Sequence, residues 1–404
     1  MDLALTPDQV RIRDVCRAVA QECATRAAEH DRDGSSPAKD YAALRDAGLY
    51  GLVIPEEYGG WGSGYVGYAL AAEELAQGSP STALSFNMHC ALLGILVYKS
   101  PLPEGTRQRI ADLVIRDGKL LCGSLSEPGH AGLMYSSRLC STQIRRTEPG
   151  YVVNGRKNFC TMVDASDYAC VFAHPEDDDN PAAAVPILLP LDRPGLRVEP
   201  VWDTLGMRAT RSDNLVMEEC LVPDEAVLEE LFVPSLPEFL QATDAVVNVP
   251  YTAVYLGVGV GALRHAVASV KERVPKGYRQ PLAYLPEVRR RVAVMSAELE
   301  AARRLLHYAA WLVDTDAPPE EAMAAFLKAK YVVGEAVAAA TRSALELGGA
   351  HATFRGSPLE RFFRDGATAT IMPPHTDVCL AQLGIRELGL DPAEIPPPLT
   401  PAEL

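Results

Sequence analysis

Three segments near the C-terminus decide the fold: Leu347-Gly348-Gly349-Ala350, Arg361-Phe362-Phe363-Arg364-Asp365 and Ile371-Met372-Pro373-Pro374-His375-Thr376. The glycine pair follows a long periodic apolar stretch, and glycine commonly ends a helix because it adopts left-handed backbone conformations. The two prolines interrupt regular structure before His375, which precedes a new helix start at Thr376. This part of the chain is therefore expected to consist of helices separated by short, specific turns.

Outward from these segments, the C-terminal third carries apolar periodicity typical of packed helices. The periodic stretches are 242–273, 286–314, 319–347 and 377–388. The first 118 residues also carry helical patterns, beginning with a capping threonine followed by proline at Thr6-Pro7.

The middle of the chain has strand patterns instead. Short runs between turn residues predict strands at 120–126, 141–146, 151–153, 168–173, 184–190 and 214–220. Asn154-Gly155 is a strong hairpin signal between 151–153 and the following 157–161. We expect an α+β fold with an N-terminal helical domain (1–119), a middle β-barrel-like domain (120–235), a C-terminal four-helix bundle (236–390) and a Pro-rich tail (391–404).

Composition excludes several function classes. The 404 residues carry a net charge of -15, which argues against nucleic acid as a partner because phosphate binding needs a basic face. The nine cysteines form no C-x-x-C pair, and the eight histidines have no ligand spacing, so we expect reduced thiols and no metal site. The N-terminus lacks the pattern of a signal peptide, no membrane span is expected, and the cytoplasm is the expected location.

Five segments, in order, resemble the acyl-CoA dehydrogenase family. They are Ala47–Gly60 (with Ile54-Pro55-Glu56-Glu57-Tyr58-Gly59-Gly60), Leu125–Gly132, Gly155–Thr161, Leu205–Ser212 and the C-terminal segments quoted above. Each segment alone is common, but five in the family's order over most of the chain indicate its fold and its cofactor, FAD.

The resemblance implies where the cofactor would bind. At the flavin ring it implies Leu125, Ser126, Phe159 and Thr161. These residues would supply hydroxyls at the polar edge of the ring and, through Phe159, a flat apolar wall. For the diphosphate and adenosine, which the family contacts across a dimer, it implies Arg273, Gly348 and Gly349.

The chain departs from the family at three places. Leu133-Met134 stands where the family usually has Ser-Asp, and the aromatic residue expected after Arg273 is missing. Pro373 occupies the position of the glutamate that removes the α-proton of an acyl thioester, and proline cannot take a proton. The substitute bases that the sequence offers are His375 and Asp244, with Asp377 also beside the prolines.

The missing base leaves three function classes open. The first is FAD-dependent oxidation of an acyl thioester, bound to CoA or to an acyl carrier protein, with a displaced base. The second is a two-component monooxygenase that uses reduced flavin and oxygen, for which His89, Ser126 and His130 are the nearby polar residues. The third is a flavin-binding relative without activity. By resemblance, the partners are an electron-transfer flavoprotein or a flavin reductase, and the chain is a homodimer or homotetramer.

Overall fold

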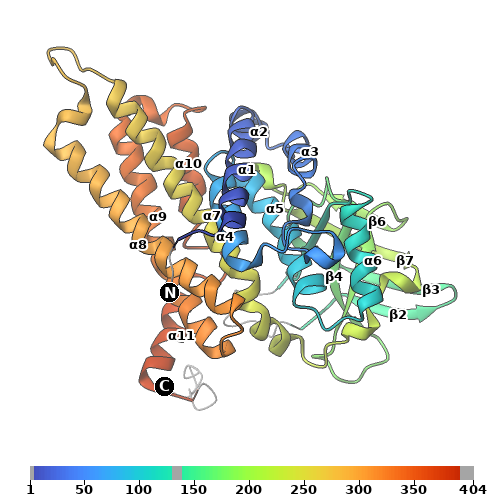
Figure 1. Cartoon of the computed structure of the whole chain (residues 1–404). Helices are drawn as coiled ribbons and strands as arrows, with labels where there is room; N and C mark the ends of the chain where they lie inside the picture. The colour runs from blue at the N-terminus through green and yellow to red at the C-terminus, as the bar shows by residue number, and fades with distance from the viewer. Residues whose placement is uncertain (1–3, 130–138, 392–404) are drawn as a thin grey trace, which may run out of the picture.

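The computed structural model describes residues 4–129 and 139–391, and it has an α+β architecture in three parts (Figure 1). The N-terminal helices, coloured blue, lie between the long C-terminal helices at the left of the view and the green β domain at the right. This arrangement confirms the predicted fold class. The domain boundaries proposed from the sequence stay predictions.

The N-terminal part consists of helices around a shared apolar core. They are α1 (Pro7–Ala24), α2 (Ala27–Asp33), α3 (Ala38–Asp46), α4 (Gly64–Ala76), α5 (Pro80–Leu93) and α6 (Glu104–Ile115). The predicted helix start is confirmed, because Thr6 and Gln9 form a reciprocal capping box at the beginning of α1. α4 and α5 are buried on nearly all sides, since they pack against α7 of the C-terminal part.

The middle part is a curled sheet of seven strands. They are β1 (Leu121–Ser124), β2 (Gln143–Thr147), β3 (Gly150–Cys160), β4 (Tyr168–Pro175), β5 (Val185–Pro190), β6 (Leu196–Glu199) and β7 (Asp213–Val222). The strand order is β1-β4-β2-β3-β7-β6, with β5 paired to β4. The β1–β4 and β2–β4 pairs are parallel and the others are antiparallel.

The hairpin predicted at Asn154-Gly155 is wrong. β3 continues through both residues, and the turn that connects it to β2 lies between Thr147 and Gly150. β7 pairs along the whole of β3, with a register shift between Val153 and Gly155. The long antiparallel pairing with β7 therefore overrides the local turn preference, and Asn154-Gly155 forms an irregularity within a strand.

The C-terminal part consists of α7 (Leu236–Glu272), α8 (Pro286–Asp314), α9 (Pro319–Gly348), α10 (Pro358–Ala367) and α11 (Thr376–Leu388). The four predicted helices are present, and α10 is a further short helix that the sequence reading did not predict. α10 packs against both α7 and α9. Its position brings Arg364 and Asp365 against the other two parts of the molecule.

Two core segments are long and apolar enough to pass a length and hydropathy test for membrane spans, Pro80–Tyr98 and Val247–Glu272. In their most apolar windows, 72% and 67% of the residues are buried inside the fold. Burial of this extent is typical of helices at the centre of a protein core.

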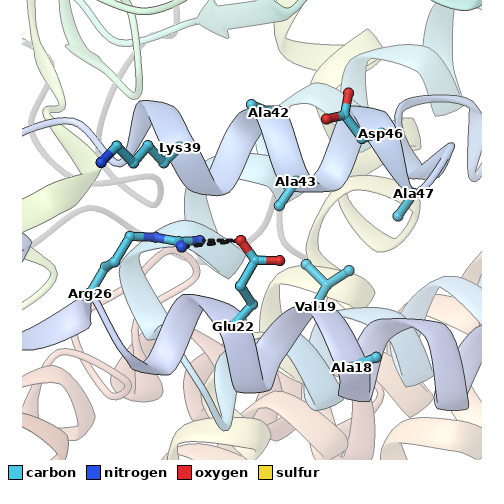
Figure 2. Close-up of a pocket in the computed structure, with 9 residues that line it drawn as sticks. All are labelled: Ala18, Val19, Glu22, Arg26, Lys39, Ala42, Ala43, Asp46 and Ala47. Atoms are coloured by element: carbon cyan, nitrogen blue, oxygen red, sulfur yellow. Dashed lines mark hydrogen bonds and ion pairs between the residues drawn. The ribbon is translucent and has the colours of Figure 1, made fainter.

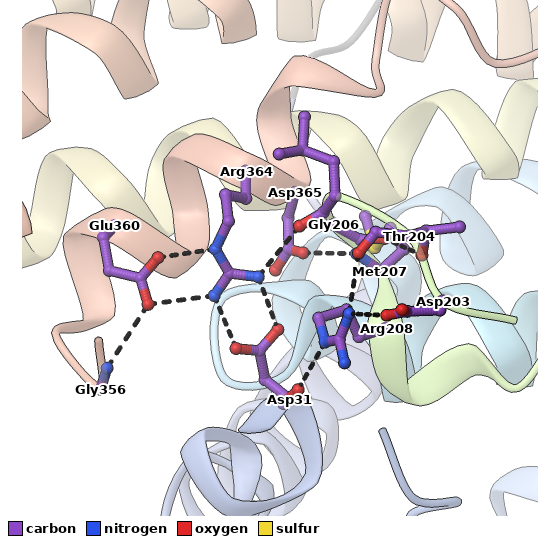
Figure 3. Close-up of polar contacts among 11 residues, drawn as sticks. Asp31, Asp203, Thr204, Gly206, Met207, Arg208, Gly356, Glu360, Arg364 and Asp365 are labelled. Atoms are coloured by element: carbon purple, nitrogen blue, oxygen red, sulfur yellow. Dashed lines mark hydrogen bonds and ion pairs between the residues drawn. The ribbon is translucent and has the colours of Figure 1, made fainter. Parts of the chain in front are cut away.

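A polar joint connects the three parts (Figure 3). The Arg364 guanidinium donates to both carboxylate oxygens of Asp31, at 2.9 and 2.6 Å, and to Glu360 at 2.6 Å through Nε. The neighbouring Asp365 accepts from the backbone N–H of Met207 at 2.6 Å, and burial raises its pKa to about 6. A Cβ at Gly206 would lie 2.4 Å from the Arg364 carbonyl oxygen, so only glycine permits this approach.

Candidate functional site

A cleft of about 420 Å³ opens on the β domain beside the end of β3. Aromatic, proline and polar side chains surround it. They are Pro128, Arg156, Asn158, Phe159, Val201, Trp202, Thr204, Ser212 and Asn214. The cleft combines apolar walls with a few hydrogen-bonding groups, which is the composition of a small-molecule site.

Phe159 is the exposed aromatic wall of this cleft. The β3–β7 register shifts between Lys157 and Cys160, and within that bulge Phe159 has a φ of 54°. A positive φ is unfavourable for a bulky residue, and such strain is typical of functional sites. The bulge leaves the Phe159 side chain 59% exposed. Leu125, the residue that directly follows β1, is 41% exposed. Phe159 and Leu125, two of the residues predicted at the flavin ring, therefore present apolar side chains that the rest of this chain does not cover.

Trp202 forms a second wall that the sequence reading missed. Its ring meets Phe159 edge to face, with centroids 6.1 Å apart and an interplanar angle of 87°. The buried carboxylate of Asp213 accepts from the backbone N–H groups of Val201 and Trp202 at 2.8 and 3.0 Å, and the indole N–H donates to the Met207 carbonyl at 3.0 Å. These bonds fix the Trp202 ring before any ligand binds.

Thr161, predicted to contact the flavin, lies one layer behind the cleft. It is 6% exposed, and its hydroxyl is 2.9 Å from the hydroxyl of Ser212, which lines the cleft. Ser212 is also 2.9 Å from the Thr210 hydroxyl, which donates to the Met207 carbonyl. Ser212 therefore stands between Thr161 and Thr210 in a chain of three hydroxyls. It belongs to the matched Leu205–Ser212 segment, but it was not among the residues that the resemblance implied at the flavin.

Ser126 is half-buried and supports the bulge through its backbone. Its carbonyl accepts from the Asn158 N–H at 2.8 Å, and its own N–H donates to the Ser124 hydroxyl at 3.3 Å. Leu125, Ser126, Phe159 and Thr161 thus come together at the junction of β1 and β3. His130, named from the sequence as a polar residue for oxygen chemistry, lies outside the described residues.

A buried ion pair beneath the cleft connects two of the matched segments. Glu127 and Lys157 have fully buried side chains and form an ion pair. Glu127 also accepts from the Thr142 hydroxyl at 2.7 Å and from Ser141, while Lys157 donates to the Phe172 carbonyl at 2.6 Å. Burial alone would raise the pKa of Glu127, but the Lys157 charge and these hydrogen bonds hold it at about 2. The pair fixes the start of the bulge that carries Phe159.

The predicted diphosphate residues form a separate cluster at the ends of α7 and α9. Arg273 donates to the carbonyl of Gly348 at 2.7 Å and to that of Leu347 at 3.4 Å. Gly349 has a φ of 68°, and a Cβ there would lie 3.6 Å from the arginine. Figure 1 places the connection between α7 and α8 at the far left and β3 at the far right. One chain therefore brings Arg273, Gly348 and Gly349 together, but not with the cleft.

The loop between α10 and α11, residues 368–375, contains no carboxylate. Pro373 is exposed there, and His375 is half-buried at the start of α11. The His375 side chain has no hydrogen-bond partner among the described residues. Asp244 lies within α7, but its side chain is outside the described part of the structure. The loop itself is held by the buried Lys330, which donates to the Ala369 carbonyl at 2.8 Å and whose pKa burial lowers to about 8.

His89 is a structural residue in this fold. It is fully buried, its Nε2 is 3.0 Å from the Tyr50 carbonyl, and its Nδ1 accepts from the Leu121 N–H at 3.1 Å. Both ring nitrogens are therefore occupied by backbone groups. His89, one of three polar residues considered for oxygen chemistry, does not line the cleft.

The His89 environment predicts a pH dependence of stability. Burial lowers its pKa from 6.5 to about 4, so the unfolded chain takes up a proton first as the pH falls. His89 should therefore contribute a loss of about 3 kcal/mol between pH 6.5 and 4. Chemical denaturation at pH 7 and pH 4 checks this: the stability difference between wild type and His89→Gln should move by about 3 kcal/mol in favour of the variant. If this stability difference is the same at pH 7 and pH 4, His89 is not held in its neutral form by burial.

A second hollow, shown in Figure 2, is a groove of about 480 Å³ between α1 and α3. Alanines and Val19 form its floor, and Glu22, Arg26, Lys39 and Asp46 stand at its edges. Arg26 is paired with Glu22 at 3.1 Å and with Asp40 at 2.7 Å. The groove contains none of the residues that the resemblance implies at the cofactor, so we assign the functional site to the cleft at Phe159.

The cleft fits a flavin ring by its own chemistry. An isoalloxazine needs a flat apolar wall and hydrogen-bonding groups at its polar edge. Phe159 and Trp202 supply rigid aromatic surface, and Ser212 supplies a hydroxyl whose orientation the Thr161–Thr210 pair fixes. The described residues contain no cluster of three or more histidine, cysteine or acidic side chains placed to hold a metal ion. All nine cysteines are free thiols, as predicted.

Comparisons with known proteins agree with this fold. Sequence models of the acyl-CoA dehydrogenase N-terminal, middle and C-terminal domains match residues 6–104, 122–220 and 249–384. The putative acyl-CoA dehydrogenase YdbM of Bacillus subtilis is 31% identical, over 90% of this chain and 93% of that protein. The L-evernosamine nitrososynthase of a Micromonospora species is 28% identical, over 96% of this chain and 92% of that protein.

A solved structure extends the likeness to three dimensions. Butyryl-CoA dehydrogenase from Megasphaera elsdenii superposes with a TM-score of 0.85 at 25% identity, covering 96% of this chain and all of that chain. Three family domains in the expected order, a relative above 30% identity and this superposition lead to one conclusion. The chain belongs to the acyl-CoA dehydrogenase family of flavoproteins.

Proposed function

We propose that this chain is a flavin-dependent oxidoreductase that uses reduced flavin and oxygen to hydroxylate its substrate, on the fold of an acyl-CoA dehydrogenase. The observation that carries the proposal is the loop between α10 and α11. It presents the exposed ring of Pro373. By resemblance, this is the position at which the family's dehydrogenases use a glutamate to remove an α-proton. Oxygen chemistry at a flavin needs no such base.

The chain's own residues would hold and shield the flavin. Bound flavin would supply the redox centre, and FAD is the form that the family resemblance implies. Phe159 and Trp202 would cover the ring. The Ser212 hydroxyl, whose proton goes to Thr210, would accept a hydrogen bond at its polar edge. Arg273 and the Gly348-Gly349 turn lie too far away in the same chain, so they would reach a dinucleotide from a second copy. The nitrososynthase relative supports an oxygen-dependent reaction because its name denotes the introduction of a nitroso group.

The test supplies reduced flavin and oxygen together. The purified protein would be mixed with a flavin reductase, NADH, isotopically heavy oxygen gas and a panel of amines that includes amino sugars. We expect mass spectrometry to show a product that carries one labelled oxygen atom. A protein that only accelerates flavin reoxidation, with no labelled product from any amine of the panel, would contradict hydroxylation of an amine.

A second candidate is oxidation of an acyl thioester, on CoA or on an acyl carrier protein, with a displaced base. The specific observation in its favour is His375, which is half-buried, unpartnered among the described residues and two positions from the family's glutamate. A histidine is a competent base near neutral pH. The identity to YdbM, named as a putative acyl-CoA dehydrogenase, points the same way. In this reading Asp244 is the alternative base, and an electron-transfer flavoprotein would accept the electrons.

Phe159 provides a test of the cofactor site under either reaction. Replacing Phe159 with alanine removes a stacking surface from an exposed position, so we expect flavin affinity to fall about tenfold, which corresponds to about 1.4 kcal/mol. Fluorescence titration with FAD measures the affinity. Phe232→Ala, which removes another exposed phenylalanine, 44% exposed and outside the lining of the cleft, serves as the matched control. If wild type and the Phe159 variant bind FAD with equal affinity, the flavin ring does not stack on Phe159.

A further inference from the structure

The peptide group at Met207 connects α10 to the walls of the cleft. Its N–H donates to the buried carboxylate of Asp365 at 2.6 Å. Its carbonyl accepts from the indole N–H of Trp202 at 3.0 Å and from the Thr210 hydroxyl at 2.9 Å. Trp202 lines the cleft, whereas Asp365 lies outside its lining. Met207 therefore joins a carboxylate on α10 to an aromatic ring in the cleft.

The same carbonyl orients the hydroxyl that lines the cleft. Because Thr210 donates to the Met207 carbonyl, its oxygen is left to accept from Ser212, 2.9 Å away. Ser212 lines the cleft beside Trp202. The position of Met207 thus determines both an aromatic wall and a hydroxyl of the candidate site.

The Met207 backbone needs support from outside its own turn. Met207 is buried, and its φ of 54° and ψ of 35° lie in the left-handed region, which costs a residue with a side chain about 1–2 kcal/mol. The turn rests directly on α10, since a Cβ at Gly206 would lie 2.4 Å from the Arg364 carbonyl oxygen and 2.8 Å from the Asp365 nitrogen. The Asp365 carboxylate is the side-chain group of α10 that holds the strained Met207 N–H.

The surroundings of Asp365 let its charge change near neutral pH. Burial raises its pKa to about 6, although the Met207 N–H and the charges of Arg361 and Arg364 favour the ionised form. The charged and titratable groups that face it are Asp31 on α2, Arg361 and Arg364 on α10, and Tyr255 on α7. An ionised acceptor makes a stronger hydrogen bond than a neutral one. Met207 is therefore held most firmly above pH 6.

We propose that Asp365 is a positioning residue of the cleft: its carboxylate, acting through the Met207 peptide, sets Trp202 and Ser212 in place, and protonation of the carboxylate loosens both. The effect on ligand affinity rests on the proposed flavin site. The coupling of Asp365 to Trp202 belongs to the unliganded chain as well. Asp365 itself touches no ligand, so it makes the affinity of the cleft depend on pH from a distance.

Tryptophan fluorescence tests the positioning without a ligand. The chain has three tryptophans, so Trp61→Phe and Trp311→Phe leave a parent protein in which only Trp202 emits. In this parent, Asp365→Ala should shift the emission to longer wavelength and speed its quenching by acrylamide. The parent should show the same change between pH 7.5 and pH 5, with a midpoint near 6. Asp365→Asn, which keeps the shape without the charge, should resemble the parent at pH 5 at every pH.

Flavin affinity tests the consequence. Asp365→Ala should weaken FAD binding about tenfold at pH 7.5, the size expected for one charge-assisted hydrogen bond. Asp40→Ala is the matched control, because Asp40 is also a fully buried carboxylate, and its partners Arg26 and Thr82 lie in the N-terminal part. That control should lower stability but change neither FAD affinity nor Trp202 quenching. In a Trp202→Phe background, Asp365→Ala should weaken FAD binding less, since one of the groups that it positions is gone.

The contrary results separate this inference from the proposed function. If Asp365→Ala and Asp365→Asn leave Trp202 quenching as in the parent, or if Asp40→Ala changes it equally, Asp365 does not position the cleft. If the Trp202 response appears but wild type binds no FAD, the positioning stands and the assignment of the cleft to a flavin fails. Should circular dichroism show that Asp365→Ala is unfolded, Asp365→Asn and the pH dependence of the parent decide the question.

Discussion

Replacing Lys157 with methionine is expected to lower the free energy of unfolding by about 3–5 kcal/mol, because it leaves a buried carboxylate without its counter-charge. Both side chains of the Lys157–Glu127 pair are fully buried. The pKa of Glu127, held at about 2 from an ordinary 4.5, corresponds to about 3 kcal/mol of stabilisation. Because the folded pKa is the lower one, this contribution is present above pH 4.5 and is lost as the pH falls toward 2.

Urea denaturation at pH 7 measures the effect. Lys119→Met is the matched control, since Lys119 pairs with Asp167 at 2.9 Å on the surface, where the two side chains are 40% and 36% exposed. That control should cost less than about 1 kcal/mol. Changing both Glu127 and Lys157 to apolar residues should cost less than the sum of the two single changes. A loss for Lys157→Met as small as that of the control would mean that the pair is not buried in solution.

The second large effect is expected at Arg364. Arg364→Met should lower the free energy of unfolding by about 3–5 kcal/mol, because Asp31 and Glu360 are then left facing each other without a cation. The arginine side chain is 11% exposed and each carboxylate side chain is 12% exposed. Since Asp31 belongs to α2 and Glu360 to α10, the loss should loosen the contact between the N-terminal and C-terminal parts (Figure 3).

A second arginine with two carboxylates serves as the comparison. Arg197 contacts Glu199 and Glu218, but its side chain is 52% exposed, so Arg197→Met should cost less than about 1 kcal/mol. Limited proteolysis provides a readout of the joint itself. The Arg364 variant should be cut faster than wild type between the parts, whereas Arg364→Lys should lie between the two, because lysine keeps the charge without the bidentate geometry. If the Arg364 and Arg197 variants are equally stable, the contact of Arg364 with Asp31 and Glu360 does not stabilise the packing of the N-terminal part on the C-terminal part.

The sequence predicts the order of helices and strands well because amphipathic periodicity and capping are local. The start of α1 at Thr6-Pro7 and the long helices α7, α8 and α9 follow directly from such patterns. The Asn154-Gly155 hairpin failed because a distant strand, β7, pairs across it. α10 is amphipathic but only ten residues long, and its Arg361–Asp365 stretch was interpreted as a family motif and not as a helix.

The candidate site, like the fold, could be predicted from the sequence only where local motifs mark it, and not where residues distant in the sequence come together. Phe159 and Leu125 lie where matched segments place them, but Trp202 and Ser212 enter the cleft through hydrogen bonds to Asp213 and Thr161 that connect distant residues. The Glu127–Lys157 pair joins two matched segments, and no local pattern shows that they touch. The sequence also left open whether His89, Ser126 or His130 would face a flavin, and the backbone partners of both His89 ring nitrogens could be identified only from the structure.

The measurement that tests the proposed chemistry most directly is an anaerobic titration of the flavin-loaded protein with acyl-CoA thioesters of several chain lengths, followed by the visible absorbance of oxidised flavin. The absence of a carboxylate at Pro373 predicts that the band persists with every thioester, while chemically reduced protein is reoxidised once oxygen is admitted. Bleaching of the band by any thioester would contradict the account, because hydride transfer from an acyl chain requires a base that removes the α-proton. His375 and Asp244 would then be the residues to replace first.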